Sequence, residues 1–298
     1  FNPRLEALEN RIALAGAIIA TGAGAGGSPN VRIFDAETNQ ETASFFAYNE
    51  AFTGGVRVAV ADITADGVPD YITGAGPGGG PQVNVFDGKT LKILTSFFAF
   101  DPSFSGGVFV AAGNFDNDRF SEIVVSAGAG GGPNVRIFNI ENGVASLARS
   151  FFAYDQSFTG GVTVAAENYN GDAGDEIITG TGQGGAPHVK IFQPAGIELG
   201  SFFAYSEQFT GGVFVTVGDM DLNGKSEIVT GAGPGGGPNV RVFNGGNATL
   251  LSSFFAFDQQ FSGGVTVSLT DVNYDGFADI VAAAGPEGAP EVSIWNSA

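Results

Sequence analysis

Cysteine is absent from this 298-residue chain, and histidine, methionine and tryptophan occur once each. Without cysteine there is neither a disulfide framework nor thiol chemistry. A lone imidazole is a poor metal or nucleophile centre, and no Ser-His-Asp set can be assembled without His188. We therefore expect no enzymatic activity, and we interpret His188 as one polar occupant of a repeated position.

Basic residues are also scarce, with 12 Lys plus Arg against 31 Asp plus Glu and a formal net charge of -19. Nucleic-acid affinity is built largely by basic side chains that displace counterions, so we expect no nucleic-acid partner. An acidic membrane surface is disfavoured for the same reason. No apolar run reaches the roughly 18 residues needed to span a bilayer, so we expect no membrane insertion.

An acidic loop of nine residues occurs five times along the chain. Each copy carries oxygen-bearing side chains at loop positions 1, 3, 5 and 9. Calcium takes six to eight oxygens at about 2.3 to 2.6 Å, and alternate positions of a tight turn plus a backbone carbonyl at position 7 supply them. The predicted ligands are Asp62, Thr64, Asp66, Val68 and Asp70; Asn114, Asp116, Asp118, Phe120 and Glu122; Asn168, Asn170, Asp172, Gly174 and Glu176; Asp219, Asp221, Asn223, Lys225 and Glu227; and Asp271, Asn273, Asp275, Phe277 and Asp279.

Three of these loops have glycine at position 6, where the chain must bend sharply, and the other two have Arg119 and Ala173 there. The copies at Asn114 and Asn168 are therefore the weaker candidates. The alternative is that Asp, Asn and Gly serve only as turn residues. Turn chemistry explains one acid per loop, whereas several liganding oxygens at fixed offsets in every copy indicate about five calcium sites.

The predicted ligand positions hold 14 of the 31 acids, and filling five sites would bring the charge from -19 to about -9. Weak sites built from several carboxylates suit millimolar extracellular calcium better than the cytosol. We therefore expect a secreted or cell-surface protein.

The loops belong to a larger repeat. Ser-Phe-Phe-Ala begins at Ser44, Ser96, Ser150, Ser201 and Ser253, and periods near 50 residues are typical of propellers or arrays. One unit predicts strands over 55–63, 70–74, 82–87 and 94–100, rich in Val, Ile, Phe and Tyr. The strands are nearly continuous apolar runs, which favours sheets buried on both faces by radial stacking. A two-sheet sandwich, the alternative, would not need such similar units.

We therefore expect an all-β protein, a β-propeller of four-stranded antiparallel blades over 17–298, with 1–16 as an N-terminal arm or linker. The glycine-rich half of the unit occurs six times and the acidic half five times. The strand count is two short of six complete blades. We expect six blades with trimmed terminal blades and no acidic loop in the first; five blades, or a fragment of seven, are the alternatives.

Three elements occur together and in order: Phe-Thr-Gly-Gly-Val at 52–56, then the acidic loop, then Gly-Ala-Gly-Pro at 74–77 followed by Val-Asn-Val-Phe at 83–86. In this the chain resembles the FG-GAP repeat of integrin α-chain propellers and many bacterial surface proteins. The resemblance covers nearly the whole chain from about residue 18. It implies a β-propeller with calcium in the loop between the first two strands of a blade, and a recognition or adhesion role.

We expect three other repeated features to stabilise the fold and not to bind a ligand. The Phe pairs lie inside strands, so we expect them in the core between blades. Arg32, Arg136, Lys190 and Arg241 share one repeat position, and we expect them to pair with carboxylates of an adjoining blade. The glycine-rich turns match a dinucleotide fingerprint as text, but a strand follows where a helix is needed. We interpret them as connections that let neighbouring blades approach closely.

The loops that join consecutive blades are the predicted partner site, for a protein or glycan ligand at the face opposite the calcium loops. Their candidate residues are Tyr48, Asn49, Asp101, Tyr154, Asp155, Tyr205 and Asp258. The expected function is calcium-binding, non-enzymatic recognition or adhesion. A lectin-like propeller is the alternative, because sugar binding needs only acids, amides and aromatics on loops. A polysaccharide lyase or hydrolase is a further alternative, with paired carboxylates such as Asp101 and Asp155.

Overall fold

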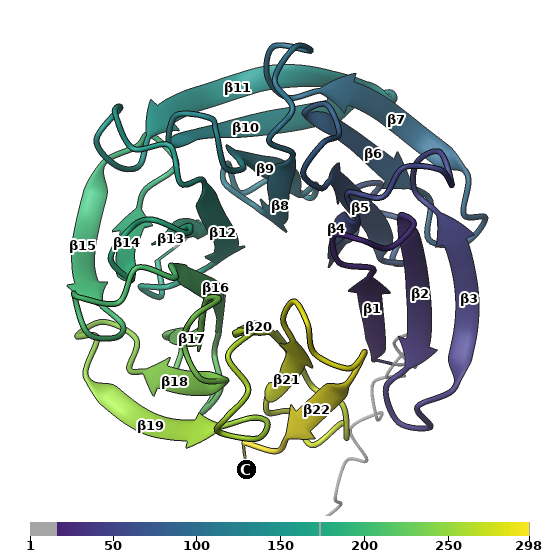
Figure 1. The fold of residues 1–298 in the computed structure, drawn as a ribbon. Helices are drawn as coiled ribbons and strands as arrows, with labels where there is room; N and C mark the ends of the chain where they lie inside the picture. The colour runs from purple at the N-terminus through teal and green to yellow at the C-terminus, as the bar shows by residue number, and fades with distance from the viewer. Residues whose placement is uncertain (1–16, 173, 298) are drawn as a thin grey trace, which may run out of the picture.

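The protein is a six-bladed β-propeller. A computed structural model describes residues 17–172 and 174–297, which form 22 strands, and no residue of these ranges is helical. The strands make six antiparallel sheets around a central axis (Figure 1). This confirms the predicted all-β propeller. The predicted arm over 1–16 lies outside the described residues, and within them no helix is long and apolar enough to cross a membrane.

The blades follow one another along the chain, and in blades 2 to 5 the first strand is innermost. Blade 1 is β1 (Ile18–Gly22), β2 (Asn30–Asp35) and β3 (Glu41–Phe46); blade 2 is β4 (Val56–Ala61), β5 (Asp70–Ala75), β6 (Gln82–Phe86) and β7 (Ile93–Phe98). Blade 3 is β8 (Val108–Gly113), β9 (Glu122–Ala127), β10 (Asn134–Glu141) and β11 (Val144–Phe152). Blade 4 is β12 (Val162–Glu167), β13 (Glu176–Thr181), β14 (His188–Phe192) and β15 (Glu198–Phe203). Blade 5 is β16 (Val213–Gly218), β17 (Glu227–Ala232), β18 (Asn239–Phe243) and β19 (Leu250–Phe255); blade 6 is β20 (Val265–Thr270), β21 (Asp279–Ala284) and β22 (Val292–Trp295).

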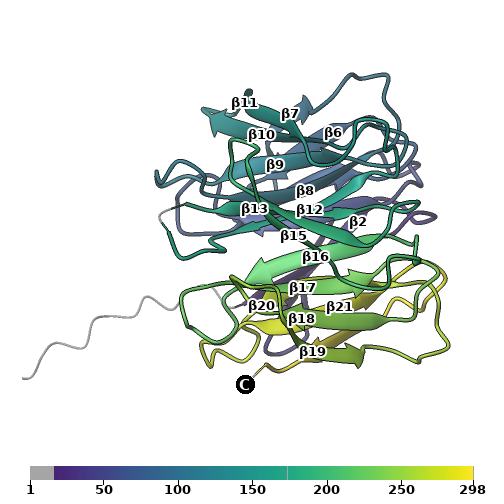
Figure 2. The ribbon, with the colours of Figure 1, turned by 90° about the vertical axis from the view of Figure 1, so that its left-hand side faces the viewer.

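The strand ends gather at two faces of the disc (Figure 2). We call the end with the five nine-residue loops between first and second strands the acidic face. The opposite end carries the glycine-rich turns, such as 76–81, and the connections between blades, such as 99–107; we call it the glycine-rich face. Because neighbouring strands are antiparallel, the two kinds of loop cannot share a face.

The second strand of each complete blade explains the long apolar runs in the sequence. Every residue of β5, β9, β13 and β17 is buried. Such a strand has a neighbouring strand on each side and a neighbouring blade on each face, so both sets of alternating side chains leave water. The expected burial on both faces is confirmed.

Five clusters of buried apolar residues form the core, one between each pair of consecutive blades. The first phenylalanine of each Ser-Phe-Phe motif takes part in them. Phe97 of blade 2 packs on Phe138 of blade 3 with ring centroids 4.8 Å apart, and Phe151 packs on Phe192 at 5.0 Å. The second phenylalanine does not: Phe98 and Phe152 are about half exposed. The prediction of core positions is therefore right for one ring of each pair and wrong for the other, because successive strand residues point to opposite faces.

Glycine allows the blades to approach at the glycine-rich face. A Cβ atom added to Gly76 would lie 1.9 Å from the carbonyl oxygen of Gly54. Gly107, with φ of 71°, would place a Cβ atom 2.5 Å from the carbonyl oxygen of Ala75 in the preceding blade. No side chain fits at either position, which confirms the structural interpretation of these turns.

The terminal blades are trimmed as expected, each in a different way. By repeat equivalence β1 is a second strand, so among residues 17–172 and 174–297 blade 1 has no innermost strand and no acidic loop. In the same ranges blade 6 has its innermost strand β20 but no outermost strand beside β22. Six blades are thus confirmed, and the alternatives of five blades or a fragment of seven are wrong. Three of the predicted strands extend past the observed ends, since β4 ends at Ala61, β6 at Phe86 and β7 at Phe98.

Candidate metal centres

Each acidic loop links the innermost and second strands of its blade, so the five loops lie at equivalent places on the acidic face. Position 4 of every loop has a positive φ: Ala65, Asn117, Gly171, Leu222 and Tyr274. At position 5 one side-chain oxygen accepts a hydrogen bond from the backbone amide two residues later. Examples are Val68 to Asp66 at 2.9 Å and Phe120 to Asp118 at 2.6 Å. The second carboxylate oxygen of Asp118 has no hydrogen-bond partner among the described residues.

Position 9 is a buried carboxylate that accepts a backbone hydrogen bond from position 2 in all five loops. The amide-to-oxygen distances are 3.0 Å for Ile63 to Asp70, 2.8 Å for Phe115 to Glu122, 3.0 Å for Tyr169 to Glu176, 3.1 Å for Met220 to Glu227 and 3.1 Å for Val272 to Asp279. Three of these carboxylates also accept an amide from farther along the blade: Gly88 to Asp70, Gly245 to Glu227 and Ser297 to Asp279. The sequence predicted these acids as metal ligands but did not predict that they accept backbone amides, because no pattern beyond the acid itself indicates those hydrogen bonds.

Burial raises the pKa of four of these carboxyls, Asp70, Glu122, Glu176 and Glu227. The backbone hydrogen bonds act in the opposite direction, and neighbouring acids of the same loop add to the increase, as Asp116 and Asp118 do for Glu122. Removing a carboxylate from water disfavours its charged form unless a cation or donors compensate. The raised pKa values therefore indicate negative charge that is only partly compensated by the protein.

The first residue separates the loops into two kinds. Asp62 and Asp219 accept amides from positions 5 and 6, and position 6 is a glycine with φ near 80°, as at Gly67 (82°) and Gly224 (83°). Asn114 and Asn168 instead accept the amide of position 4, at 2.8 Å in both loops, and donate their Nδ2 to the carbonyl of position 5. In the Asn114 loop the position-1 side chain bonds to positions 4 and 5 and not to the position-6 amide, so glycine is not required there. The Asn114 and Asn168 loops thus share a different hydrogen-bond arrangement at position 1.

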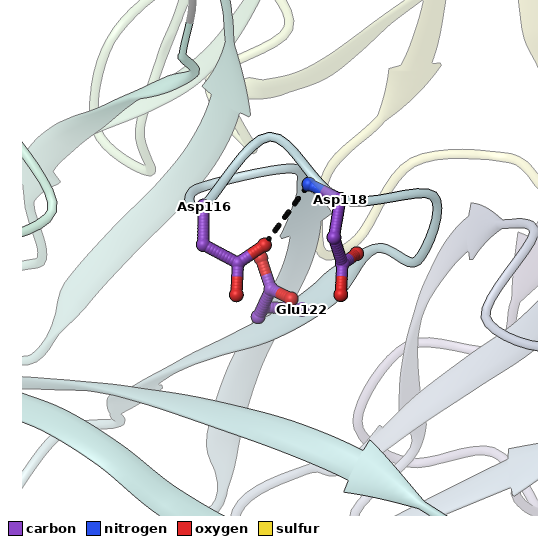
Figure 3. A group of neighbouring side chains, drawn as sticks. All are labelled: Asp116, Asp118 and Glu122. Carbon is purple, nitrogen blue, oxygen red and sulfur yellow. Dashed lines mark hydrogen bonds between the residues drawn. The ribbon is translucent and has the colours of Figure 1, made fainter.

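Two loops bring three carboxylates together. The ligand oxygens of Asp116, Asp118 and Glu122 lie within 4.8 Å of one another, as do those of Asp219, Asp221 and Glu227. In the first group, the Asp118 backbone amide also donates to the Asp116 carboxylate at 3.2 Å (Figure 3). Converging carboxylate oxygens are the ligands that hard cations such as calcium require. Each of these two clusters can therefore hold a metal ion, including the Asn114 loop that the sequence ranked lower.

In the other three loops an N–H donor of the protein reaches the carboxylates. Lys89 Nζ donates to Asp66 at 2.7 Å; Asn170 Nδ2 donates to Asp172 and Glu176, both at 2.9 Å; and Asn273 Nδ2 donates to Asp275 at 2.9 Å. The Asp271 Oδ1 atom, in contrast, is buried without a hydrogen-bond partner among the described residues. The oxygen-rich donor set fits calcium, and that orphaned oxygen is one place where a cation would satisfy a buried acceptor.

The predicted partner residues divide into buried and exposed positions on the glycine-rich face. The Tyr48 hydroxyl lies 2.9 Å from the carbonyl oxygens of Thr73 and Gln82 in the next blade, and Tyr154 and Tyr205 make equivalent contacts. Burial raises the pKa of all three tyrosines. Asn49, Asp101, Asp155 and Asp258 are exposed in the same connections. The tyrosines thus join blades, and the acids and the amide face solvent.

A shallow cavity of about 200 Å³ lies where blades 1 and 2 meet on this face, lined by Tyr48, Asn49, Phe52, Ala75, Gly79, Gly80 and Gln82. The side chain of Gln82 donates to the Ser96 hydroxyl at 3.0 Å. Asn49 is exposed, and its side-chain oxygen accepts the Ala51 amide at 2.9 Å. The cavity combines an aromatic wall with two amides, which is a surface for a small polar ligand.

The basic side chains at the shared repeat position do not pair with carboxylates of an adjoining blade, as the sequence had predicted. They are Arg32, Arg136, Lys190 and Arg241. Arg32 and Lys190 bind Glu41 and Glu198 of their own blades. Arg136 and Arg241 donate to the backbone carbonyls of Ala99 and Ala204 in the preceding blade, each at 2.8 Å. Their guanidinium groups also lie over aromatic rings, 4.7 Å from Phe100 for Arg136. The predicted pairing with carboxylates of an adjoining blade is wrong because backbone carbonyls and rings occupy that position.

No protein-family model matches the chain, and no curated protein matches it by sequence. Solved propellers resemble it in structure. The exotype rhamnogalacturonan lyase YesX matches 92% of this chain and 50% of its own, at 14% identity and a TM-score of 0.49. Chaetomium thermophilum Sqt1, solved bound to the N-terminus of the ribosomal protein L10, matches 94% of this chain and 67% of its own, at 15% identity and a TM-score of 0.54. The Dos1 propeller matches 94% and 65%, at 12% identity and a TM-score of 0.50. The chain thus spans half the length of the lyase. The similarities to Sqt1 and Dos1 establish the propeller fold alone.

Proposed function

We propose that the chain is a calcium-binding, non-enzymatic recognition propeller of the FG-GAP class, secreted or displayed at a cell surface. The observation that carries the proposal is the repetition of one loop design at five equivalent places. In each loop position 5 accepts an amide from position 7, and a buried position-9 carboxylate braces position 2. Five copies of one acidic design at one face suit a structural cation better than a single catalytic centre.

Bound calcium would supply positive charge at the point where the second strand enters the blade. Asp116, Asp118 and Glu122 would hold one ion, and Asp219, Asp221 and Glu227 another. Glu122 and Glu227, the position-9 carboxylates of these two clusters, are buried and have raised pKa values, so a cation that binds only the folded state stabilises it. At a calcium concentration about tenfold above the dissociation constant, each site contributes about 1.4 kcal/mol.

Thermal unfolding tests this proposal. We expect the melting temperature to be higher in calcium than in chelator, with magnesium giving a smaller increase because it demands a tighter octahedral site. Asp118→Asn and Asp221→Asn should each reduce the increase, since each removes one carboxylate of a three-carboxylate cluster. Asp155→Asn is the matched control, because Asp155 is an exposed acid at the opposite face. This variant should leave the calcium-dependent increase in melting temperature unchanged. Equal melting temperatures in calcium and chelator would exclude the metal role.

The recognition surface that we propose is the glycine-rich face. Asn49, Asp101, Asp155 and Asp258 are exposed there at equivalent places in four of the five junctions between consecutive blades. Asp101 and Asp155 each accept the amide and hydroxyl of the serine two residues later, so their side chains have fixed positions. A row of fixed polar groups is suited to binding a protein or glycan that repeats or extends across the junctions.

The cavity between blades 1 and 2 favours a lectin as the second candidate, because its size and its aromatic and amide lining suit one sugar ring. A glycan array, combined with an assay for released reducing ends, separates the possibilities. Glycan binding without release of reducing ends supports a lectin, and release of reducing ends supports a lyase or hydrolase. No signal in either assay leaves a protein partner as the remaining possibility. An Asn49→Ala variant should lose glycan binding if this cavity is used, while Asn247→Ala at the other face should retain it.

A further inference from the structure

Arg57 is the only basic residue on the innermost strands that the structure describes. These strands, β4, β8, β12, β16 and β20, surround the central axis (Figure 1). Arg57 is the second residue of β4, so it lies near the glycine-rich face, and the acidic loop follows the other end of the strand. The residues at the same repeat position are Phe109, Thr163, Phe214 and Thr266. A single cation therefore occurs at a position that is otherwise uncharged.

The guanidinium group of Arg57 is held between blades 2 and 3. Its Nη1 donates to the carbonyl of Val108 in β8 at 3.0 Å and to that of Ala75 in β5 at 3.4 Å. The guanidinium carbon lies 3.8 Å from the centre of the Phe109 ring, a distance at which a cation is attracted to the ring face. These contacts fix the position of the group and use one of its three nitrogens.

Thr163 connects blades 4 and 5 in the same way with a hydroxyl group alone. Its Oγ1 donates to the carbonyl of Val213, the repeat equivalent of Val108, at 2.8 Å and to that of Gly180 at 3.3 Å. Phe109 and Phe214 have no donor at this position. The connection between blades therefore needs at most one donor atom, and the Nε and Nη2 donors of Arg57 are not explained by it.

The Nε and Nη2 atoms of Arg57 have no hydrogen-bond or ion-pair partner among the described residues. Both atoms reach solvent, because Asp271 Oδ1 is the only unpaired side-chain nitrogen or oxygen without solvent contact in the buried and half-buried residues described. Arg136 and Arg241 differ, since the Nε of each donates to an asparagine of its own strand. Arg57 thus keeps an unused pair of adjacent donors.

The charge of Arg57 is not compensated by the protein. Burial lowers the pKa of Arg57 to about 10, because removing a cation from water disfavours its charged form. No carboxylate of the described residues forms an ion pair with it, although the chain has 31 acids. An arginine edge with two parallel N–H groups matches the two oxygens of a carboxylate. The charge and the donor geometry therefore favour the same kind of ligand.

We infer that Arg57 is a binding site for the carboxylate group of a small ligand at the innermost strands, between blades 2 and 3. Nε and Nη2 donate to the two carboxylate oxygens, while Nη1 and the Phe109 ring keep the guanidinium in place. A sugar acid and an acidic amino acid both carry this group. The site goes beyond the recognition proposed above, because neither the calcium loops nor the exposed acids between blades take part in it.

The Nε–H resonance of Arg57, observed by NMR in isotope-labelled protein, tests the inference directly. The probes are glucuronate and acetyl-glutamate amide, and their neutral counterparts are glucose and acetyl-glutamine amide. We expect a saturable shift with at least one of the two acids, at a dissociation constant of about 1 mM, and none with the neutral compounds. The acid that binds more tightly identifies the source of the carboxylate. No saturable shift with either acid, or equal shifts with an acid and its neutral counterpart, would overturn the inference.

Substitutions of Arg57 separate its charge from its paired donors, with affinity measured on the proton signals of the acid itself. Arg57→Thr introduces the residue that the repeat uses at Thr163, so it keeps a donor for the Val108 carbonyl and should weaken binding at least about tenfold. Arg57→Lys keeps the charge without the paired donors and should also weaken binding about tenfold.

Arg136→Lys is the matched control and should leave the affinity unchanged, because the Nε of Arg136 is already bonded to Asn134. A native proton spectrum of each variant shows that it is folded. If Arg57→Thr binds the acid as tightly as the unaltered protein, the site is elsewhere and the inference is wrong. If Arg57→Lys does so, charge alone attracts the ligand and the assignment to the Nε and Nη2 pair is wrong.

Discussion

The hydroxyl groups of Tyr48, Tyr154 and Tyr205 tie consecutive blades together at the glycine-rich face. Each reaches the backbone carbonyls of two strands in the next blade, at 2.8 and 3.1 Å for Tyr154. Phe100 and Phe257 occupy the same repeat position in the other two junctions. An aromatic ring therefore packs at this position in all five junctions between consecutive blades, and a hydroxyl group is present in three of them.

Tyr154→Phe should lower the free energy of unfolding by about 1 kcal/mol, because the ring still packs while the carbonyls of Thr179 and His188 lose a buried donor. Denaturant unfolding monitored by fluorescence measures this difference. The converse variant, Phe100→Tyr, places a hydroxyl near the equivalent carbonyl of Asn134 and should not destabilise. If Tyr154→Phe has no effect and Phe100→Tyr destabilises, the hydroxyl has no bridging role.

The position-9 carboxyls give the stability a pH dependence with a definite sign. Burial raises the pKa of Glu122 and Glu227 above the ordinary 4.5, so the folded state binds these protons more tightly than the unfolded state. Without metal, this contribution to stability is full below about pH 4.5 and is lost as the pH rises through the raised pKa values. Calcium competes with the same protons, so its stabilising effect should shrink as the pH falls.

Melting temperatures in calcium and in chelator across pH 4 to 8 measure this competition. We expect the difference between the two curves to be largest near pH 7 and to begin to decline above pH 4.5. A Glu122→Gln, Glu227→Gln double variant should show a smaller and flatter difference. A difference that grows toward acid pH would contradict the assignment of these carboxyls to the cation.

At the scale of the element, the five loops share a sequence pattern but not a single hydrogen-bond scheme. The sequence predicted the loop positions, the sharp bend at Gly67, Gly224 and Gly276, and the separate status of the loops at Asn114 and Asn168. The Asn168 loop has only two acidic ligands, but among the four loops with three the sequence did not predict which gather their carboxylates. That depends on donors outside or beside the pattern, such as Lys89 in the hairpin between β6 and β7 and the Nδ2 group of Asn273.

Lys89 gives a direct test of this explanation. Its ammonium binds Asp66 at 2.7 Å and so takes an oxygen that a metal ion would use. Lys89→Gln should free that carboxylate and tighten calcium binding to the Asp62 loop roughly tenfold, as the competing positive charge is removed. Native mass spectrometry at graded calcium concentrations should show one additional ion bound at lower concentration.

Lys92→Gln is the matched control, since Lys92 carries the same charge in the same hairpin and makes no ion pair among the described residues. It should leave the calcium stoichiometry unchanged. Equal effects of the two variants would mean that general charge, and not the contact with Asp66, sets the affinity.

At the scale of the whole molecule, five core clusters connect six blades in series, and among the described residues no such cluster joins blade 6 to blade 1. Stability in such an array is a sum over neighbouring units, so units at an interruption open first. Amide hydrogen exchange should therefore be at least about tenfold faster in β1 and β22 than in β9 and β13, which are enclosed by complete blades. Exchange measured by mass spectrometry in chelator and in calcium tests this order, and uniform protection of all four strands would contradict it.

The repeat made the whole fold predictable to an unusual degree. The recurrence of Ser-Phe-Phe-Ala and of the glycine-rich turns gave the number of blades and the strand missing from each end. The orientation of single side chains was less accessible. Adjacent residues such as Phe97 and Phe98 have the same chemistry, and only the register between strands decides which ring is covered. The partners of Arg136 and Arg241 depended on backbone carbonyls, which no sequence pattern displays.

The acidic loops also make the disc electrically polar. They concentrate 15 of the 31 acids at one of its two faces. In low-salt, metal-free solution two molecules would repel each other most strongly when these faces meet, over a distance of roughly 30 Å at 0.01 M ionic strength. Occupied sites would weaken that repulsion, so the concentration of divalent cations would control how closely and in which orientation the discs stack.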